Sequence, residues 1–242
     1  MKKSIFAVLI AIWSAMVVPV QSQTGQEIFQ SCVDAMGINR AIDSFKTFSI
    51  KTILYSQGDR VSMTYMSKEI GEDEHVSRFE QRHQGKEEAF VITNDEFFRV
   101  VPNFEMFDLE DAGQIHNILI NVFPHVIINR YAKDTSENVN YEVLEPAKFN
   151  GKNAKRVKVS DKDDENKENY AIYCFDEASN FYLGFEVPQY KVAVYAESPK
   201  RTKGFTYSSV IKVMREGKKT QEFEIDKFEA NITLDDKLFS KP

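Results

Sequence analysis

The chain has little cysteine, and what it has forms no recognisable motif. Two cysteines occur among 242 residues, Cys32 and Cys174, and there is no Cys-x-x-Cys pair. A redox dithiol and a thiolate zinc site are therefore not supported. The even count leaves two alternatives open. In an oxidising compartment the two cysteines can form a disulfide; otherwise they are buried thiols, since Cys32 falls on an apolar helical stripe and Cys174 within a strand pattern.

The chain also lacks the short motifs of common enzymes and metal sites. It has no Gly-x-Ser-x-Gly nucleophile elbow, and its ten glycines are too scattered to form a phosphate loop. The four histidines, His75, His83, His116 and His125, form no His-x-His or His-Glu-x-x-His pair, so we expect them to be solvated. We therefore expect the protein to bind no metal and no cofactor and not to be an enzyme. A hydrolase of an envelope lipid or glycan stays open as a less favoured hypothesis, because spacing in sequence cannot reveal a carboxylate pair that the fold assembles.

Basic charge is scarce as well. Lys and Arg number 31 against 37 Asp and Glu, which gives a net charge of −6 at pH 7. The basic surface that nucleic-acid binding requires is absent, so no nucleic-acid partner is expected. Hydrophobic residues make up 42% of the chain and charged residues 28%, which excludes a collagenous or disordered protein and leaves enough apolar side chains for a core.

The first 22 residues have the pattern of a secretion signal. Two lysines follow Met1, an apolar run covers 5–20, and Ser22 is a small residue suited to cleavage. A membrane anchor is the alternative, but a span needs about 20 unbroken apolar residues. We therefore expect 1–22 to be a signal peptide and 23–242 to be one domain, a periplasmic or secreted monomer.

Helical spacing of apolar residues occurs in two places. The first predicts a helix over 26–36 that ends at Gly37, with a short second turn over 41–45. The second covers 109–131, where Asp108 is the expected N-cap and Pro124 is expected to kink or split the helix. Its apolar stripe consists of Ile115, Ile118, Leu119, Val122, Phe123, Val126 and Ile127.

Most of the remaining chain alternates with a period of two. Turn sequences at 57–59, 84–86 and 93–95 separate short runs of this kind, which favours antiparallel neighbours. About eleven strands result. The fold class is therefore α+β, with the helices on one face of a large curved sheet. Large apolar side chains such as Phe181, Phe185 and Tyr207 alternate on the late strands; they fill a core, or they line a space between the sheet and its helices.

Several segments, in this order, resemble LolA/LolB-like periplasmic lipoprotein carriers, the outer-membrane lipoprotein-sorting proteins. The start of the resemblance is Asp34-Ala35-Met36-Gly37-Ile38 followed by Ser44-Phe45-Lys46-Thr47-Phe48. Similar segments follow at 92–102, 149–159, 173–176 and 181–183, and the ending at 228–239 is also similar. One departure is that many relatives have paired glycines where this chain has only Gly37.

The resemblance implies a half-open antiparallel β-barrel of about eleven strands wrapped around a helical lid, with a hydrophobic cavity between them. A carrier of a lipid or of lipoprotein acyl chains is the implied function, with an envelope membrane protein as a further partner. An envelope sensor or interaction module is the alternative. We expect the cavity and lid to be lined by Ile115, Ile118, Leu119, Val122, Phe123, Val126, Ile127, Phe181, Phe185 and Tyr207.

Overall fold

The computed structural model describes residues 23–38, 46–71, 74–113, 115, 124–163, 169–202 and 204–242. The expected signal peptide lies outside these ranges, as do the second helical turn expected at 41–45 and His116. Among the described helices, none is both long enough and apolar enough to cross a bilayer.

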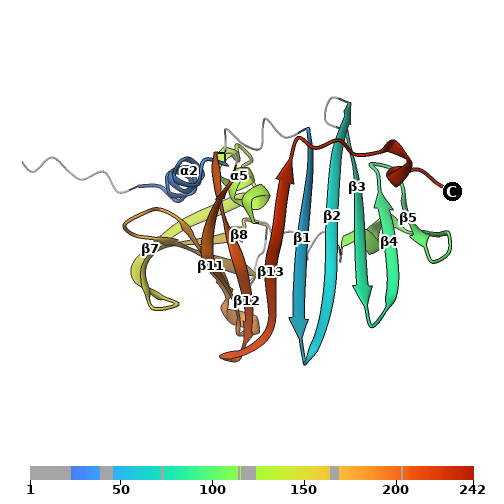
Figure 1. Cartoon of the computed structure of the whole chain (residues 1–242). Coiled ribbons are helices and arrows are strands. Elements are labelled where there is room, and N and C mark those ends of the chain that lie inside the picture. The colour runs from blue at the N-terminus through green and yellow to red at the C-terminus, as the bar shows by residue number, and fades with distance from the viewer. Residues whose placement is uncertain are drawn as a thin grey trace, which may run out of the picture.

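One open antiparallel sheet of thirteen strands makes up most of the described chain (Figure 1). Its strands are β1 (Thr47–Ser56), β2 (Asp59–Gly71), β3 (Glu74–His83), β4 (Lys86–Ile92), β5 (Phe97–Val101), β6 (Glu105–Phe107), β7 (Val139–Phe149), β8 (Lys152–Asp161), β9 (Tyr170–Asp176), β10 (Tyr182–Val187), β11 (Val192–Thr202), β12 (Phe205–Arg215) and β13 (Lys218–Ala230). Across the sheet the order is β6-β5-β4-β3-β2-β1-β13-β12-β11-β10-β9-β8-β7.

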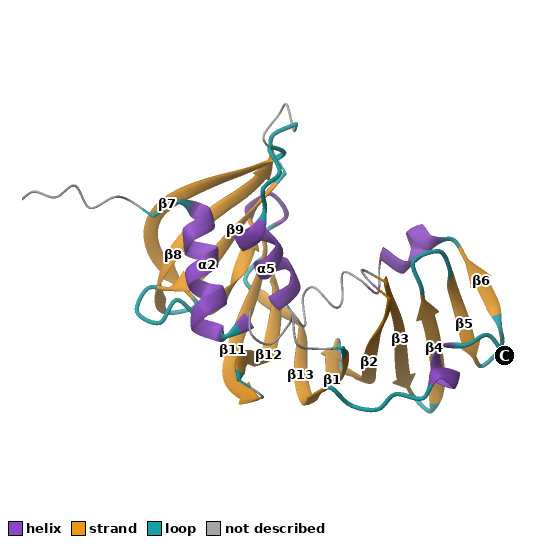
Figure 2. Cartoon of the chain, turned by 90° about the horizontal axis from the view of Figure 1, so that it is seen from above, coloured by secondary structure: helices purple, strands orange, loops and turns teal. Residues whose placement is uncertain are grey.

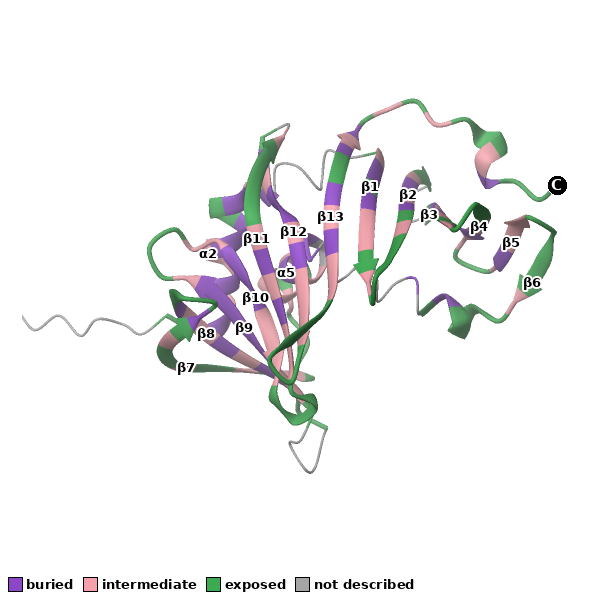
Figure 3. Cartoon of the chain, turned by 60° about the horizontal axis from the view of Figure 1, so that its bottom comes forward, coloured by how far each residue is buried: buried purple, intermediate pink, exposed green. Residues whose placement is uncertain are grey.

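This order makes the sheet a half-open barrel. Strands β1 to β6 follow one another from the centre of the sheet to one edge. Strands β7 to β13 follow one another from the opposite edge back to the centre, where β13 pairs with β1. The edges, β6 and β7, are largely exposed (Figure 3). The expected α+β half-barrel is confirmed, with thirteen strands instead of about eleven. A strand as short as the three-residue β6 carries no alternating pattern.

Four hairpins share one turn chemistry that fits a twisted sheet. Each has two central residues with positive φ, the second of them glycine: Gln57-Gly58, Gln84-Gly85, Asn150-Gly151 and Glu216-Gly217. Turns of this kind match the right-handed twist of the flanking strands. They account for the tight meander on both sides of the centre, and the predicted turns at 57–59 and 84–86 are confirmed.

The first predicted helix is confirmed as α2 (Gly25–Met36). Thr24 caps it: its side chain accepts a hydrogen bond from the Glu27 backbone, and the Glu27 side chain accepts one from the Thr24 backbone. Gly37 ends the helix at φ +72°, where a Cβ atom would lie 2.5 Å from the Gly204 carbonyl oxygen. Only glycine permits both the left-handed backbone and this close approach.

The second predicted helical segment is described near its two ends. A 3-10 turn, η1 (Leu109–Ala112), follows Asp108, whose side chain makes no capping hydrogen bond. Helix α5 (His125–Lys133) begins directly after Pro124. Proline lacks the amide that an interior helical position needs, so Pro124 suits the position just before the first residue of α5. Residues 116–123 lie outside the described ranges.

The two described α-helices, α2 and α5, cover one side of the half-barrel. Helix α2 packs against α5 and against β7, β8 and β12, and Figure 2 shows the two helices over this side with β1 to β6 beyond them. We call β7 to β12 the covered half and β1 to β6 the open half. On the convex face, the C-terminal segment with η3 (Asp236–Phe239) packs against β2 to β5; the remaining short turn, η2 (Pro188–Tyr190), follows β10.

Candidate functional site

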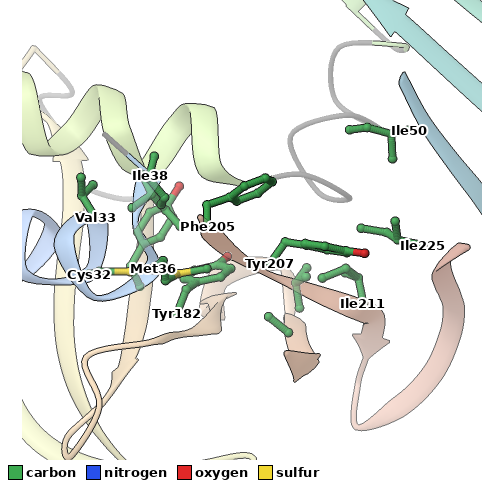
Figure 4. Close-up of a cluster of buried hydrophobic side chains, with 14 of the residues drawn as sticks. Cys32, Val33, Met36, Ile38, Ile50, Tyr182, Phe205, Tyr207, Ile211 and Ile225 are labelled. Atoms are coloured by element: carbon green, nitrogen blue, oxygen red, sulfur yellow. Dashed lines mark hydrogen bonds between the residues drawn. The ribbon is translucent and has the colours of Figure 1, made fainter. Parts of the chain in front are cut away.

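A single hydrophobic cluster runs along the concave face through both halves. Figure 4 shows its middle part, where side chains of α2 meet those of the central strands. Taken element by element from α2 to β1, its members include Cys32, Val33 and Met36 on α2, Phe205, Tyr207 and Ile211 on β12, Ile225 on β13 and Ile50 on β1. All of them are buried, so the two halves share one continuous core.

In the covered half the helices fill the concavity with side chains. Phe29 of α2 is fully buried, with its ring edge-on to Tyr131, Tyr141, Tyr173 and Phe175 at centroid distances of 5.0 to 6.1 Å. Edge-to-face contacts of this kind add to the stability gained from burial. Here the side chains beneath α2 form a filled core.

In the open half the concave face presents a row of paired apolar side chains. Tyr65 faces Phe79, and Phe79 faces Phe90, on three neighbouring strands. A second row runs from Ile92 through Phe97 to Phe107. Strand alternation brings these residues to one face. Phe79, Phe97 and Met63 are buried, whereas the others are partly exposed, and we call the set the open-half surface: Leu54, Val61, Met63, Tyr65, Phe79, Phe90, Ile92, Phe97 and Phe107.

Polar groups lie at the margins of the open-half surface. The Tyr65 hydroxyl and Ser77 Oγ are 2.7 Å apart, and Ser77 Oγ donates to Ser67 Oγ at 3.3 Å. Burial raises the pKa of Tyr65, so its hydroxyl stays protonated. Elsewhere the Arg99 guanidinium lies 5.7 Å from the centre of the Phe107 ring and is paired with Glu105. The surface is thus apolar in its middle and can hydrogen-bond at its ends.

The structure places part of the predicted cavity lining. Ile115 is buried in the main cluster, and Ile127 of α5 packs against it. Phe185 stacks on Tyr173 with ring centroids 5.6 Å apart, while Tyr207 lies between Phe205 and Phe228. Phe181 is partly buried beside the same cluster. Ile118, Leu119, Val122 and Phe123 lie outside the described residues, as does the side chain of Val126.

The two cysteines are buried free thiols. Cys32 belongs to the concave cluster, whereas Cys174 belongs to a second cluster on the convex face, because it alternates with Tyr173 and Phe175 along β9. The sheet therefore separates them, and the disulfide alternative does not hold. Burial raises the pKa of the Cys174 thiol to about 12 and that of Cys32 as well, so neither is a reactive thiolate at neutral pH.

His125 corrects the expectation of solvated histidines. Its side chain is only 1% exposed at the start of α5, where Nε2–H donates to the Thr206 carbonyl oxygen at 2.9 Å and the ring lies edge-on to Phe205. Burial lowers the pKa of His125 to about 4, and the bond to Thr206 offsets this only in part. The sequence did contain one sign of this burial: His125 follows Val122 of the apolar stripe by three residues, which is a helical spacing. Within the described ranges, no three His, Cys, Asp or Glu side chains are placed to hold a metal ion.

Comparison with known proteins finds similarity of fold. No protein-family model matches the sequence, and no curated protein matches it significantly. A solved domain assigned as an outer membrane lipoprotein-sorting protein, from Vibrio parahaemolyticus, has a TM-score of 0.56 at 13% identity over 89% of this chain and 95% of that one. A LolA-superfamily protein from Nitrosomonas europaea gives 0.54 at 11% identity over 91% and 99%.

A third structure, a DUF1329-family protein from Desulfovibrio piger, has a TM-score of 0.52 at 8% identity over 90% of this chain and 98% of that one. These matches span nearly the whole of each protein. The chain therefore has the LolA-like fold, and the resemblance seen in the sequence is confirmed at the level of the fold. At such identities the comparison speaks for the architecture alone.

Proposed function

We propose that this protein is an exported carrier or binder of a hydrophobic ligand, a lipid or the acyl chains of a lipoprotein. The observation that carries the proposal is the open-half surface, an apolar concave wall that extends beyond α2 and α5 and stays partly exposed. Each buried CH2 group contributes about 0.8 kcal/mol, so contacts alone can hold an acyl chain reversibly. One solved domain of the same fold is assigned as an outer membrane lipoprotein-sorting protein, which supports this choice.

The first test is to look for the ligand itself. Protein purified from its native envelope is analysed by native mass spectrometry and lipid extraction, and the delipidated protein is titrated with a fluorescent fatty acid. We expect a bound lipid and saturable binding. An empty protein that also fails to bind the probe would refute the proposal.

A matched pair of variants tests the location. Phe107 and Met106 are neighbours on β6 but point to opposite faces, so Phe107→Asp places a carboxylate on the open-half surface and Met106→Asp places one on the convex side. Phe107→Asp should weaken fatty-acid binding about tenfold, because a charge among apolar groups disfavours an acyl chain. Met106→Asp should leave binding unchanged. Equal effects would place the ligand elsewhere.

We also propose that the stripe from Ile115 to Ile127 acts as a lid that hinges near Pro124. Substituting Phe123→Ala discriminates between a lid and a simple core element. A core role predicts a loss of about 3 to 5 kcal/mol in unfolding free energy. A cavity-lining role predicts a smaller loss and a clear change in lipid affinity. Normal binding with greatly reduced stability would contradict the lid.

An envelope sensor or interaction module is the second candidate, and the sheet edge at β6 favours it. Phe104, Met106 and Leu109 are between 43% and 47% exposed within six residues of chain. Such clustering is typical of interaction surfaces. A pull-down from envelope extract should then retain a partner after delipidation and lose it with Met106→Asp. Loss of all partners on delipidation would favour the carrier.

A further inference from the structure

Strands β10 and β11 separate before β11 ends. The two strands pair from Val187↔Val192 to Gly184↔Tyr195, whereas β11 continues beyond Tyr195 in pairing with β12 as far as Thr202. Gly184 stands at the last pair: it has φ +133°, and a Cβ atom there would lie 1.9 Å from the Val194 carbonyl oxygen. The backbones approach closely at Gly184, and the sheet splits directly beyond it.

A hollow of about 260 Å³ occupies this split. Its floor consists of buried side chains from both sides of the split and from α2: Met36, Tyr182, Leu183, Ala196 and Tyr207. Figure 4 shows Met36 of α2 beside Tyr182 of β10, with Tyr207 of β12 farther along the cluster. Its rim is exposed and polar, with Asn150, Lys152 and Ser198 among its residues. The hollow thus leads from solvent to the apolar cluster beneath α2.

A second hollow of about 340 Å³ adjoins the first at the C-terminal end of α2. The two share Met36, Phe181 and Thr206 in their walls. Phe181 comes directly before β10 and is only partly buried, so its ring forms a wall between the hollows that a change of rotamer can move. Moving the ring would join the two spaces.

The charges on the two rims favour an anion. Lys152 lines the first hollow and Arg201 the second. The carboxylate of Glu197 accepts hydrogen bonds from Lys212 Nζ at 2.6 Å and from Asn150 Nδ2 at 2.9 Å, which lowers its pKa despite burial and neutralises its charge locally. Asp34 is the remaining acid of the lining, and its Oδ1 accepts a hydrogen bond from Gln30.

We propose that this split is a ligand entrance, separate from the open-half surface, that admits one unbranched acyl chain of an anionic amphiphile. The chain lies on the apolar floor, the head group stays at the rim beside Lys152 and Arg201, and Phe181 closes the path. The proposal rests on the proposed function and adds to it the route and the head-group charge. The first hollow, at about 260 Å³, is smaller than the roughly 300 to 1,000 Å³ of pockets for larger ligands, which fits a single chain.

A matched pair of variants on β11 tests the route. Ala196→Leu fills the floor, whereas Ala193→Leu makes the same change on the opposite face of the strand, away from the hollow. Isothermal titration with dodecanoate should show at least fivefold weaker binding for Ala196→Leu and no change for Ala193→Leu. Phe181→Ala should strengthen binding about threefold, because it removes the wall.

Head-group preference is tested with three probes of equal chain length. Dodecanoate should bind more tightly than dodecanol, and dodecyltrimethylammonium should bind least. Lys152→Glu should weaken dodecanoate binding about fivefold and leave dodecanol unchanged, whereas the exposed Lys148, outside both linings, serves as the control in Lys148→Glu. An unchanged ratio of dodecanoate affinity to dodecanol affinity in Lys152→Glu would overturn the proposed anion preference.

A photoactivatable fatty acid on the unmodified protein gives a readout that needs no variant to fold. Labelling of the peptide around 181–183 or of α2 supports the entrance. Labelling confined to β4, β5 and β6, with binding lost in Phe107→Asp but not in Ala196→Leu, would overturn the entrance and leave the proposed function standing. Absence of binding by any chain would refute both.

Discussion

Acid should destabilise this protein well before its carboxylates become protonated, because of His125. The pKa of this buried imidazole is lowered from 6.5 to about 4, so the folded protein binds fewer protons than the unfolded chain between these values. Stability must then rise with pH in that window and fall as the pH drops. At 1.36 kcal/mol per pKa unit, the expected loss is about 2 kcal/mol between pH 7 and pH 5, and about 3 kcal/mol below pH 4.

The assay is urea denaturation at several pH values from 7.5 to 4.5. His125→Gln removes the titrating group, so the variant should lose most of this pH dependence even though it begins less stable at pH 7. His83→Gln, at a histidine whose side chain is 42% exposed, should keep the wild-type slope. Unchanged pH dependence in His125→Gln would show that the buried imidazole does not control acid stability.

Three further predictions concern packing. Phe29→Ala should lower the unfolding free energy by about 3 to 5 kcal/mol, whereas Phe104→Ala, at a 46% exposed position, should cost less than about 1 kcal/mol in the same denaturation assay. Gly37→Ala should cost about 2 kcal/mol or more by thermal unfolding, because the new Cβ would lie 2.5 Å from a carbonyl oxygen; Gly58→Ala, with open space around it, should cost about 1 kcal/mol. Phe239→Ala should cost roughly 3 kcal/mol and speed hydrogen exchange in β3 and β4, and unchanged exchange there would show that the C-terminal segment does not stabilise the sheet.

Local patterns in the sequence were sufficient for much of the fold. Helix α2 has its cap at Thr24, its apolar stripe and its stop at Gly37 within fourteen residues of chain, so nothing distant is needed to predict it. Hairpins closed by Gln57-Gly58 or Gln84-Gly85 are equally local. The pairing of β1 with β13 is different, because it joins residues far apart in the chain and depends on the whole sheet.

From the sequence, the apolar character of the candidate site could be predicted, but not its place in the fold. Alternation places every second residue of one strand on one face, but it cannot relate the faces of different strands. Phe79, Phe90 and Phe97 were therefore missed as members of one surface, and so was the position of α2 and α5 over β7 to β12. The split beside Gly184 had no signal in the apolar pattern, since it depends on where two neighbouring strands stop pairing. A histidine beside an apolar helical stripe is usually exposed to solvent, which is why the sequence predicts a solvated His125. In the structure its position beside β12 buries it.

The division of the concave face has a consequence for how binding and stability are related. In the covered half, rings such as Phe29 are fully buried among their neighbours, so substitutions there act on folding first. In the open half, Phe90 and Phe107 retain exposed surface, and water leaves them completely only when another apolar group covers them. A ligand that covers this surface therefore gains the hydrophobic free energy of burying the area that stays exposed after folding. Because the two halves share one sheet and one continuous cluster, bound ligand should raise the unfolding free energy of the whole domain in proportion to the logarithm of its concentration.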